Sequence, residues 1–340
     1  MRLRLALLLS LIALAIRISA DPLPVSSNRI WFAPVPGALD YLRLFEHSEE
    51  WARARSVITV FKFYQQHTQT PAPSIVGPNG YDALVRAGAF RKLAEWGIKT
   101  SIEVGAVKEF WCTSDASGME ASIQATLGSA RAVQDAGGSL QYLAMDEPFV
   151  SGRQRVCGGP ALEPTADRLK TYMTAVRAAQ PNIKLGLIDA YPFSSAADFE
   201  RMLALLHERG VVPSFLHLDV DWHALKAGEF ARDVPRIAAA AKAEGIPFGV
   251  VVWGYNGDAD RLFASDAGEI TNLLAQTFET WDNMPEQIVF QSWAVSGTGL
   301  LITPSLLPET RLYTHTSLVW DLFRRLRGST GGNTGRAIPR

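Results

Sequence analysis

The sequence predicts an α/β fold in which a single domain forms a closed (β/α)8 barrel, the TIM barrel. Short runs rich in Val, Ile, Leu and aromatic residues recur along the chain, as is typical of buried strands. They lie at 29–34, 56–63, 99–106, 140–145, 184–190, 215–221, 248–253 and 287–294. Ala- and Leu-rich stretches with helical spacing separate most of them, at 81–95, 119–136, 164–179, 196–208, 230–243 and 266–281, and another follows at 310–326.

Glycines that follow the predicted helices support a parallel order of strands. Gly97, Gly137, Gly210 and Gly245 each come between a helical stretch and the next strand, where helices commonly end. Repetition of helix, glycine and strand is typical of parallel βα units. The alternative is an open doubly wound sheet, which carries a Gly-rich phosphate turn after its first strand. The segment PVPG at 34–37 is not such a turn, so a barrel is favoured.

Length and charge agree with one globular domain. The chain has 340 residues, of which 47% are hydrophobic and 20% charged. A barrel takes about 250 residues, and more with long loops, so a second domain is not required. The net charge of -1 gives no electrostatic reason to expect nucleic acid or an anionic membrane as a partner.

The N-terminus has the features of a secretory signal peptide. Arg2 and Arg4 precede an apolar run at 5–16, and a cleavage site is expected after Ala20. The run is shorter than the roughly 20 residues of a membrane-spanning helix. We therefore expect a signal peptide at 1–20, a barrel domain at 21–327 and a disordered tail at 328–340. The expected location is secreted or periplasmic, without membrane attachment after cleavage, and an uncleaved anchor is the alternative.

The carboxyl ends of the predicted strands carry acidic and aromatic residues, and this is the end where barrels hold their active sites. Carboxylates serve as acid, base or nucleophile, and aromatic faces stack on sugar rings, so the set predicts a glycoside-cleaving cleft. The candidate catalytic residues are Glu147, Asp219, Asp221, Glu103 and Asp146. The candidate substrate-binding residues are Lys62, Tyr64, Asp189, Tyr191, Trp222, Trp253, Tyr255, Asn256, Gln291 and Trp293. Alternatively, the acids only cap helices or pair with Arg and Lys.

Two short motifs resemble those of known enzymes. Met145-Asp146-Glu147-Pro148 resembles the end of strand four in the large clan of (β/α)8 glycoside hydrolases, where Asn-Glu-Pro carries the acid/base glutamate. By that resemblance Glu147 is the general acid. Gln291-Ser292-Trp293 is similar to the tryptophan-ended last strand of that clan and of family-18 chitinases.

The chain also departs from the clan. Asp146 replaces the usual Asn, and Trp253-Gly254-Tyr255-Asn256 stands where the clan has its nucleophilic glutamate on strand seven. The second carboxylate must then come from another strand. Asp219 and Asp221 are the first candidates, followed by Glu103 and Asp189.

We therefore expect an exported glycoside hydrolase that acts on a neutral oligo- or polysaccharide without a metal or organic cofactor. Lys62 is the one cation expected at the rim, which disfavours a strongly anionic polymer. One alternative is a carbohydrate-binding barrel without activity. Another is a metal-dependent hydrolase or lyase that uses His217, Asp219, Asp221 and His223, which alternate along strand six. The sequence does not predict the sugar, the linkage or the oligomeric state.

The two cysteines are expected to form a disulfide. Cys112 lies nine residues after Glu103, and Cys157 lies ten after Glu147, so both fall in neighbouring loops at the rim. Disulfides are common in exported proteins. The bond would close a loop of roughly 45 residues and stabilise the fold by about 3–4 kcal/mol in the chain-entropy model. Two buried free thiols are the alternative.

Overall fold

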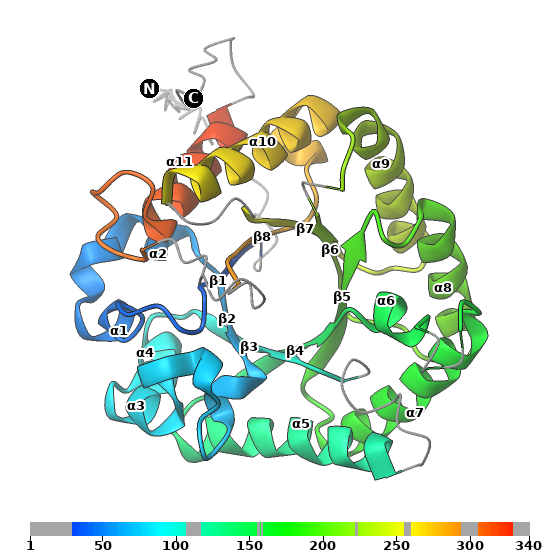
Figure 1. Cartoon of the computed structure of the whole chain (residues 1–340), viewed down its shortest axis with the longest axis horizontal. Helices are drawn as coiled ribbons and strands as arrows, with labels where there is room; N and C mark the ends of the chain where they lie inside the picture. The colour runs from blue at the N-terminus through cyan, green and yellow to red at the C-terminus, as the bar shows by residue number, and fades with distance from the viewer. Residues whose placement is uncertain are drawn as a thin grey trace, which may run out of the picture.

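The computed structural model describes residues 29–106, 117–154, 157, 159–221, 224–254, 260–293 and 305–328. Eight parallel strands follow one another in sequence order and close into a barrel, with β8 paired to β1 (Figure 1). The strands are β1 (Ile30–Ala33), β2 (Val60–Tyr64), β3 (Lys99–Val104), β4 (Leu140–Asp146), β5 (Lys184–Tyr191), β6 (Leu216–Val220), β7 (Phe248–Val252) and β8 (Gln287–Gln291). The predicted (β/α)8 barrel is thus confirmed.

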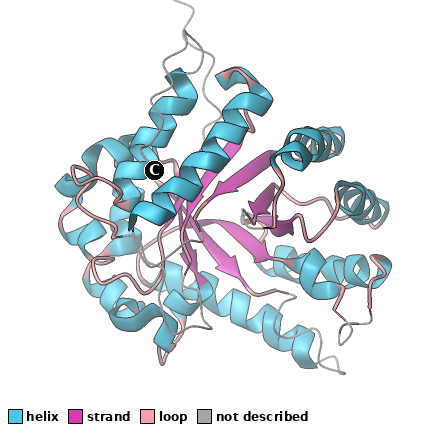
Figure 2. Cartoon of the chain, turned by 45° about the horizontal axis from the view of Figure 1, so that its top comes forward, coloured by secondary structure: helices cyan, strands magenta, loops and turns pink. Residues whose placement is uncertain are grey.

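Helices surround the barrel on its outer side (Figures 1 and 2). The α-helices are α1 (Arg43–Glu46), α2 (Ala52–Val57), α3 (Tyr81–Arg86), α4 (Ala89–Glu95), α5 (Ser117–Asp135), α6 (Pro148–Gly152), α7 (Glu163–Ala179), α8 (Ala196–Glu208), α9 (Ala227–Ala243), α10 (Asp260–Phe278) and α11 (His315–Gly328). Short 3-10 helices are η1 (Ser48–Trp51), η2 (Gln65–Thr68), η3 (Ser74–Asn79) and η5 (Trp281–Asn283). No helix in the described ranges has the length and apolar character that crossing a bilayer requires.

Two predicted boundaries were wrong for local reasons. The helix expected at 81–95 is divided into α3 and α4, because Gly88 adopts a left-handed backbone with φ of 69°. The strand expected from residue 56 starts at Val60, because α2 extends to Val57. The predicted signal peptide and nearly all of the predicted tail lie outside the described residues and stay predictions.

Side chains alternate between the two faces of every strand. Those that face outward pack under the helices, as Phe32 and Phe61 do, and form the larger core. Those that face inward form a second, smaller core, which consists of Trp31, Val60, Tyr142, Ala144, Ile188, Phe215, Val251 and Val289. The Trp31 ring lies 5.0 Å from Tyr142 and 4.6 Å from the His217 ring. The lower barrel is therefore filled, and it forms an apolar floor beneath the strand ends.

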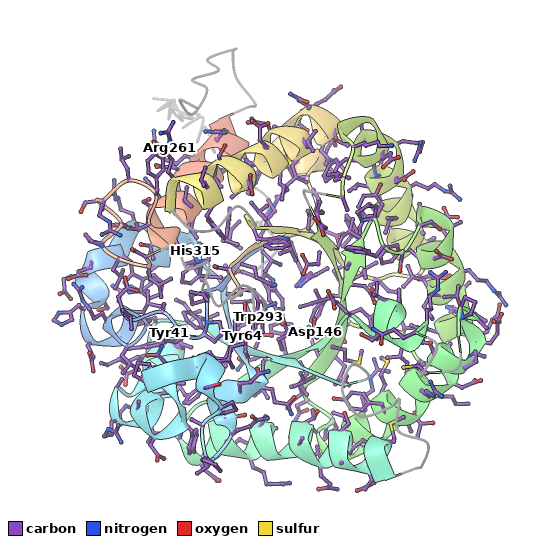
Figure 3. The ribbon with its side chains drawn as sticks, viewed as in Figure 1. Tyr41, Tyr64, Asp146, Arg261, Trp293 and His315 are labelled. Atoms are coloured by element: carbon purple, nitrogen blue, oxygen red, sulfur yellow. The ribbon has the colours of Figure 1, made fainter. Side chains whose placement is uncertain are left out.

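Because apolar side chains fill the lower barrel, several polar residues of the inward face lie at the barrel opening. Tyr64, Asp146 and Trp293 lie over the centre of the barrel, whereas Tyr41 and His315 lie between the strands and the helices (Figure 3). Ring contacts agree with this placement of His315. The centroid of its ring lies 4.8 Å from that of Phe32 and 5.5 Å from that of Phe263. The orientation of each strand-end side chain thus decides whether it lies in the barrel opening or in the outer wall, the layer between the strands and the helices.

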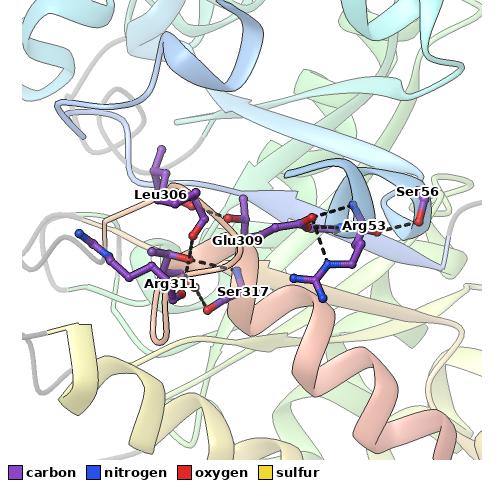
Figure 4. A network of polar contacts seen from close by, with 10 residues as sticks. Arg53, Ser56, Leu306, Glu309, Arg311 and Ser317 are labelled. Carbon is purple, nitrogen blue, oxygen red and sulfur yellow. Dashed lines mark hydrogen bonds and ion pairs between the residues drawn. The ribbon is translucent and has the colours of Figure 1, made fainter. Parts of the chain in front are cut away.

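The segment between β8 and α11 is bonded to the first helices of the chain (Figure 4). The buried carboxylate of Glu309 accepts a hydrogen bond from the Arg53 guanidinium at 3.1 Å and from the backbone N–H of Ala54 at 2.9 Å. Asp40 accepts bonds from the backbone N–H groups of Leu306 and Leu307. These contacts join the end of the barrel to its beginning and complete its closure.

The packing of the floor predicts the effect of a single added methyl group. In Gly249→Ala the new Cβ would lie 2.7 Å from the His217 ring and 2.9 Å from the backbone oxygen of Gln287. Overpacking of this kind costs about 1–3 kcal/mol, so we expect that loss in the free energy of unfolding, measured in urea. Gly228→Ala on α9 is the control, because nothing lies within 4 Å of its added Cβ. Equal stability of the two variants would contradict the packed floor.

Candidate active site

Alternation along the strands brings part of the predicted set into the barrel opening. Trp31, Val60, Tyr142 and Phe215 face inward, so residues spaced by two from them on the same strands also face inward. By this rule and by their contacts, the inward set at the opening consists of Lys62, Tyr64, Glu103, Asp146, Asp219, Trp253, Gln291 and Trp293. Glu147 follows directly after Asp146. Five strands and the end of a sixth, β7, thus contribute to one site.

Lys62 lies at the centre of this set and is wholly buried. Its Nζ donates hydrogen bonds to Oε2 of Glu103, with which it forms an ion pair, and to Oε1 of Gln291 at 2.6 Å. The two partners are themselves less than one-tenth exposed. Lys62 was predicted to contact substrate, but its side chain is wholly buried and its Nζ is bonded to Glu103 and Gln291.

Asp219 occupies the most unusual electrostatic position. It is half-buried, and its Oδ1 is enclosed without a hydrogen-bond partner. Desolvation raises the pKa of Asp219 to about 8, with the negative charge of Glu147 as the next cause, while Lys62 acts in the opposite direction. At neutral pH the side chain of Asp219 therefore carries a proton.

Glu147 stands at the point where β4 turns into α6. Its φ of 45° and ψ of 46° place a non-glycine residue in the left-handed region, which costs about 1–2 kcal/mol. The backbone N–H of Glu147 donates to the carbonyl of Ile188 at 2.8 Å, and Pro148 begins the helix. Strain of this kind is retained mainly where a side chain must point in one direction.

Two predicted substrate contacts belong instead to the outer wall, because they alternate with the inward Ile188 and Ala190. Asp189 is wholly buried and accepts hydrogen bonds from the backbone N–H groups of Phe149, Val150 and Ala190. Tyr191 donates its hydroxyl to Asp233 on α9 at 2.9 Å. We do not carry either residue forward as a substrate contact. Asp189 bonds the first turn of α6, which follows Glu147 directly.

The polar residues of strand six lie at different levels of the barrel, from the floor to the opening. His217 lies in the floor, where its Nε2 bonds Gln287, and burial lowers its pKa to about 3, so the ring is neutral. Asp221 accepts a hydrogen bond from the backbone N–H of Ala224 and so caps the turn after the strand. Within the described ranges, no three His, Cys, Asp or Glu residues are placed to hold a metal ion.

Aromatic rings line one side of the opening. Tyr64 and Trp293 lie with ring centroids 4.5 Å apart, and the Tyr64 hydroxyl donates to the backbone oxygen of Ser292 at 2.8 Å. Trp293 and Trp253 are both half-exposed. The opening thus offers apolar ring faces beside its carboxyl groups.

One inward residue was absent from the predicted set. Ser101 pairs with Lys62 in the β2–β3 register, is wholly buried, and has an Oγ without a hydrogen-bond partner among the described residues. Its position two residues before Glu103 was the signal that placed it on the same face.

Some predicted residues lie outside the described residues, namely Cys112, Trp222, His223, Tyr255 and Asn256. Cys157 is buried, and no free cysteine occurs among the described residues. The pairing of Cys157 with Cys112 stays a prediction.

Solved structures of the same fold include several carbohydrate-active enzymes. A thermostable mutant of a xylanase (Xyn10A) from Cellvibrio japonicus is 12% identical with a TM-score of 0.57 over 88% of this chain and 97% of that chain. The GH53 catalytic domain of Ignisphaera aggregans is 14% identical, with a TM-score of 0.53 over 80% and 86%. Native xylanase 10B from Thermotoga maritima is 13% identical, with a TM-score of 0.51 over 89% and 98%.

At this level of identity the likeness shows the fold alone. No protein-family model matches the chain. No curated protein matches it in sequence. The function must therefore be argued from the residues of the opening.

The left-handed backbone of Glu147 predicts which of two substitutions at this position costs less free energy of unfolding. Glu147→Ala and Glu147→Gly remove the same carboxyl group, but only glycine adopts the left-handed region without penalty. We expect the Gly variant to have the higher free energy of unfolding, by about 1 kcal/mol. On ordinary strand or helix backbone the Ala variant would be the more stable by about 0.5–1 kcal/mol. That reverse order, measured by thermal or urea unfolding, would show that the residue is not held in the strained conformation.

Proposed function

We propose that the chain is an exported glycoside hydrolase that cleaves a neutral oligo- or polysaccharide by carboxylate catalysis at the barrel opening. The observation that carries the proposal is the pairing of two unlike carboxyl groups, Asp219 and Glu147, at one site. Desolvation raises the pKa of Asp219 to about 8, and the negative charge of Glu147, which is partly exposed at the rim, raises it further. Two carboxyl groups in contrasting environments are the arrangement that acid/base cleavage of a glycoside requires.

The environments favour one assignment of roles. By resemblance to the glycoside hydrolase clan, Glu147 was expected to be the acid. The enclosed Asp219 is the better proton donor at neutral pH, since burial raises its pKa to about 8. In the proposed reaction the proton passes from Asp219 to the glycosidic oxygen as the bond from that oxygen to the anomeric carbon breaks. The carboxylate of Glu147 stabilises the positive charge that develops on the sugar ring. A water molecule then adds to the anomeric carbon, and the proton that it loses passes to the Asp219 carboxylate, which restores the acid.

The two alternatives have less support from the described residues. A metal-dependent enzyme would need His217 at the opening, but that ring is buried in the floor and bonded to Gln287. A carbohydrate-binding barrel without activity was suggested by the missing glutamate on strand seven. The partner for Glu147 is supplied by β6 instead, so that absence does not exclude catalysis.

Export is proposed on the N-terminal sequence and the pair of cysteines. The neutral substrate is proposed on the partly exposed rings of Trp253 and Trp293. Lys62, the one cation that was expected at the rim, is buried and paired with Glu103.

Substitution of either carboxyl group is expected to stop turnover. We expect Asp219→Asn and Glu147→Gln each to lower kcat by about 100-fold or more on a susceptible oligosaccharide, since positioned proton transfer contributes about that much. Melting temperatures should stay within a few degrees of the parent, and Glu200→Gln on α8 should leave kcat unchanged. Because Asp219 must be protonated to act, kcat/KM should fall as the pH rises through about 8. Undiminished turnover in Asp219→Asn would remove Asp219 from the mechanism.

The aromatic rings predict binding that depends on Trp293. Titration of neutral xylo- and cello-oligosaccharides should change the tryptophan fluorescence of the Asp219→Asn protein. Trp293→Ala should weaken that binding by roughly 10-fold, which corresponds to about 1.4 kcal/mol. Trp320→Ala is the control, because Trp320 lies on α11, outside the barrel. Binding of uronic-acid oligosaccharides in preference to neutral ones would overturn the proposed substrate class.

A further inference from the structure

We propose that Gln291 determines specificity by donating a hydrogen bond from its amide nitrogen, Nε2, to a hydroxyl group of the sugar ring that lies against Trp293. This contact lies within the substrate class of the proposed function and rests on it. The sequence predicted only that Gln291 contacts substrate. The contact is made by one particular atom, and it selects a ligand group that can accept a hydrogen bond.

The bond to Lys62 fixes which end of the Gln291 amide is turned away from it. An ammonium group can only donate hydrogen bonds, so the atom of Gln291 that Lys62 Nζ contacts at 2.6 Å must be the oxygen, Oε1. The opposite orientation would place two donors against each other. Lys62 is wholly buried and is also held by its ion pair with Glu103, so its ammonium group keeps one position. The amide nitrogen of Gln291 therefore points away from Lys62.

The amide nitrogen of Gln291 is accessible from the barrel opening. Only 6% of the surface of Gln291 is exposed, but the residue faces inward and the apolar floor fills the barrel below it. The exposed part therefore faces the opening. Within the described residues Nε2 makes no hydrogen bond, and unlike Oγ of Ser101 it is not an enclosed atom. Nε2 can thus donate to a ligand group that enters the opening.

An aromatic layer lies directly above the bond between Lys62 and Gln291. Tyr64 is two residues beyond Lys62 on β2, and Trp293 is two residues beyond Gln291 at the end of β8 (Figure 3). The two rings lie 4.5 Å apart, and the Tyr64 hydroxyl donates to the backbone oxygen of Ser292 at 2.8 Å, which holds them in place. A sugar ring that stacks on the partly exposed Trp293 has the hydroxyl groups of its lower edge near Gln291.

The carboxylate of Glu103 limits what Gln291 can bind. Lys62 Nζ contacts both Glu103 and Gln291, so the carboxylate lies next to the amide. A hydroxyl group can accept a hydrogen bond from Nε2 and donate one to a carboxylate. An anionic ligand group could only accept, and it would lie beside a second carboxylate. The position therefore favours the hydroxyl group of a neutral sugar over a uronic acid.

The test compares two substitutions of Gln291 in the Asp219→Asn protein, so that the oligosaccharide is not consumed. Gln291→Glu keeps an oxygen for Lys62 but removes the donor, because a carboxyl group beside an ammonium group stays ionised. Gln291→Met removes both. We expect each variant to raise the Kd for xylotetraose or cellotetraose by about 10-fold, measured by tryptophan fluorescence. The melting temperature should fall in Gln291→Met more than in Gln291→Glu. Gln134→Glu, on the exposed side of α5, is the matched control and should leave the Kd unchanged.

An unchanged Kd in Gln291→Glu would overturn the proposal, because glutamate can replace a residue that only supports Lys62. Should one of the two variants fail to fold, the Kd of the other decides. Turnover by the parent is measured separately. An active parent with an unchanged Kd in Gln291→Glu would refute the contact and leave the proposed function standing. Weakened binding in a chain that cleaves no neutral glycan would do the reverse, and absence of binding to any neutral oligosaccharide would refute both.

Discussion

Closure of the parallel sheet into a barrel is the constraint on which the rest of this structure depends. Once β8 pairs with β1, each strand has one face toward the helices and one toward a narrow interior. The interior is wide enough only for side chains, and Trp31, Tyr142 and Phe215 fill its lower part. Polar groups on the inward face must therefore either pair within the barrel, as His217 does with Gln287, or lie at the opening. The candidate active site is formed by the inward polar residues that lie above this apolar floor.

The same closure explains the electrostatics of the opening. Lys62 contacts Glu103, 41 positions later in the sequence, and Gln291, more than 200 positions later. These contacts form because closure of the barrel brings strands two, three and eight close together. The apolar floor reduces hydration from below, so the carboxyl groups above it affect one another strongly. Asp219 keeps its proton as a result, while Glu103 is held in an ion pair.

The contrast between Asp219 and Glu147 links this electrostatic arrangement to catalysis. Solved barrels of carbohydrate-active enzymes share the fold of this chain, but at 12–14% identity they say nothing of its chemistry. The chain lacks a glutamate on strand seven. Instead, Asp219 on β6 places a carboxyl group at the opening. Under the proposed function, β4 and β6 supply the pair of carboxyl groups for cleavage.

The order and type of the strands and helices were determined by the sequence itself, because runs of apolar residues and the glycines after helices are local signals. The same signals were sufficient to locate Glu147, Asp219, Tyr64 and Trp293 near strand ends. Only the tertiary structure decided which strand-end residues face the opening: Asp189 and Asp219 both lie near strand ends, but the first faces the wall and the second the interior. A shift of one residue in a strand reverses its faces, and no local signal reports that shift. Contacts across the closed barrel, such as the one from Lys62 to Gln291, likewise exist only once distant strands have paired.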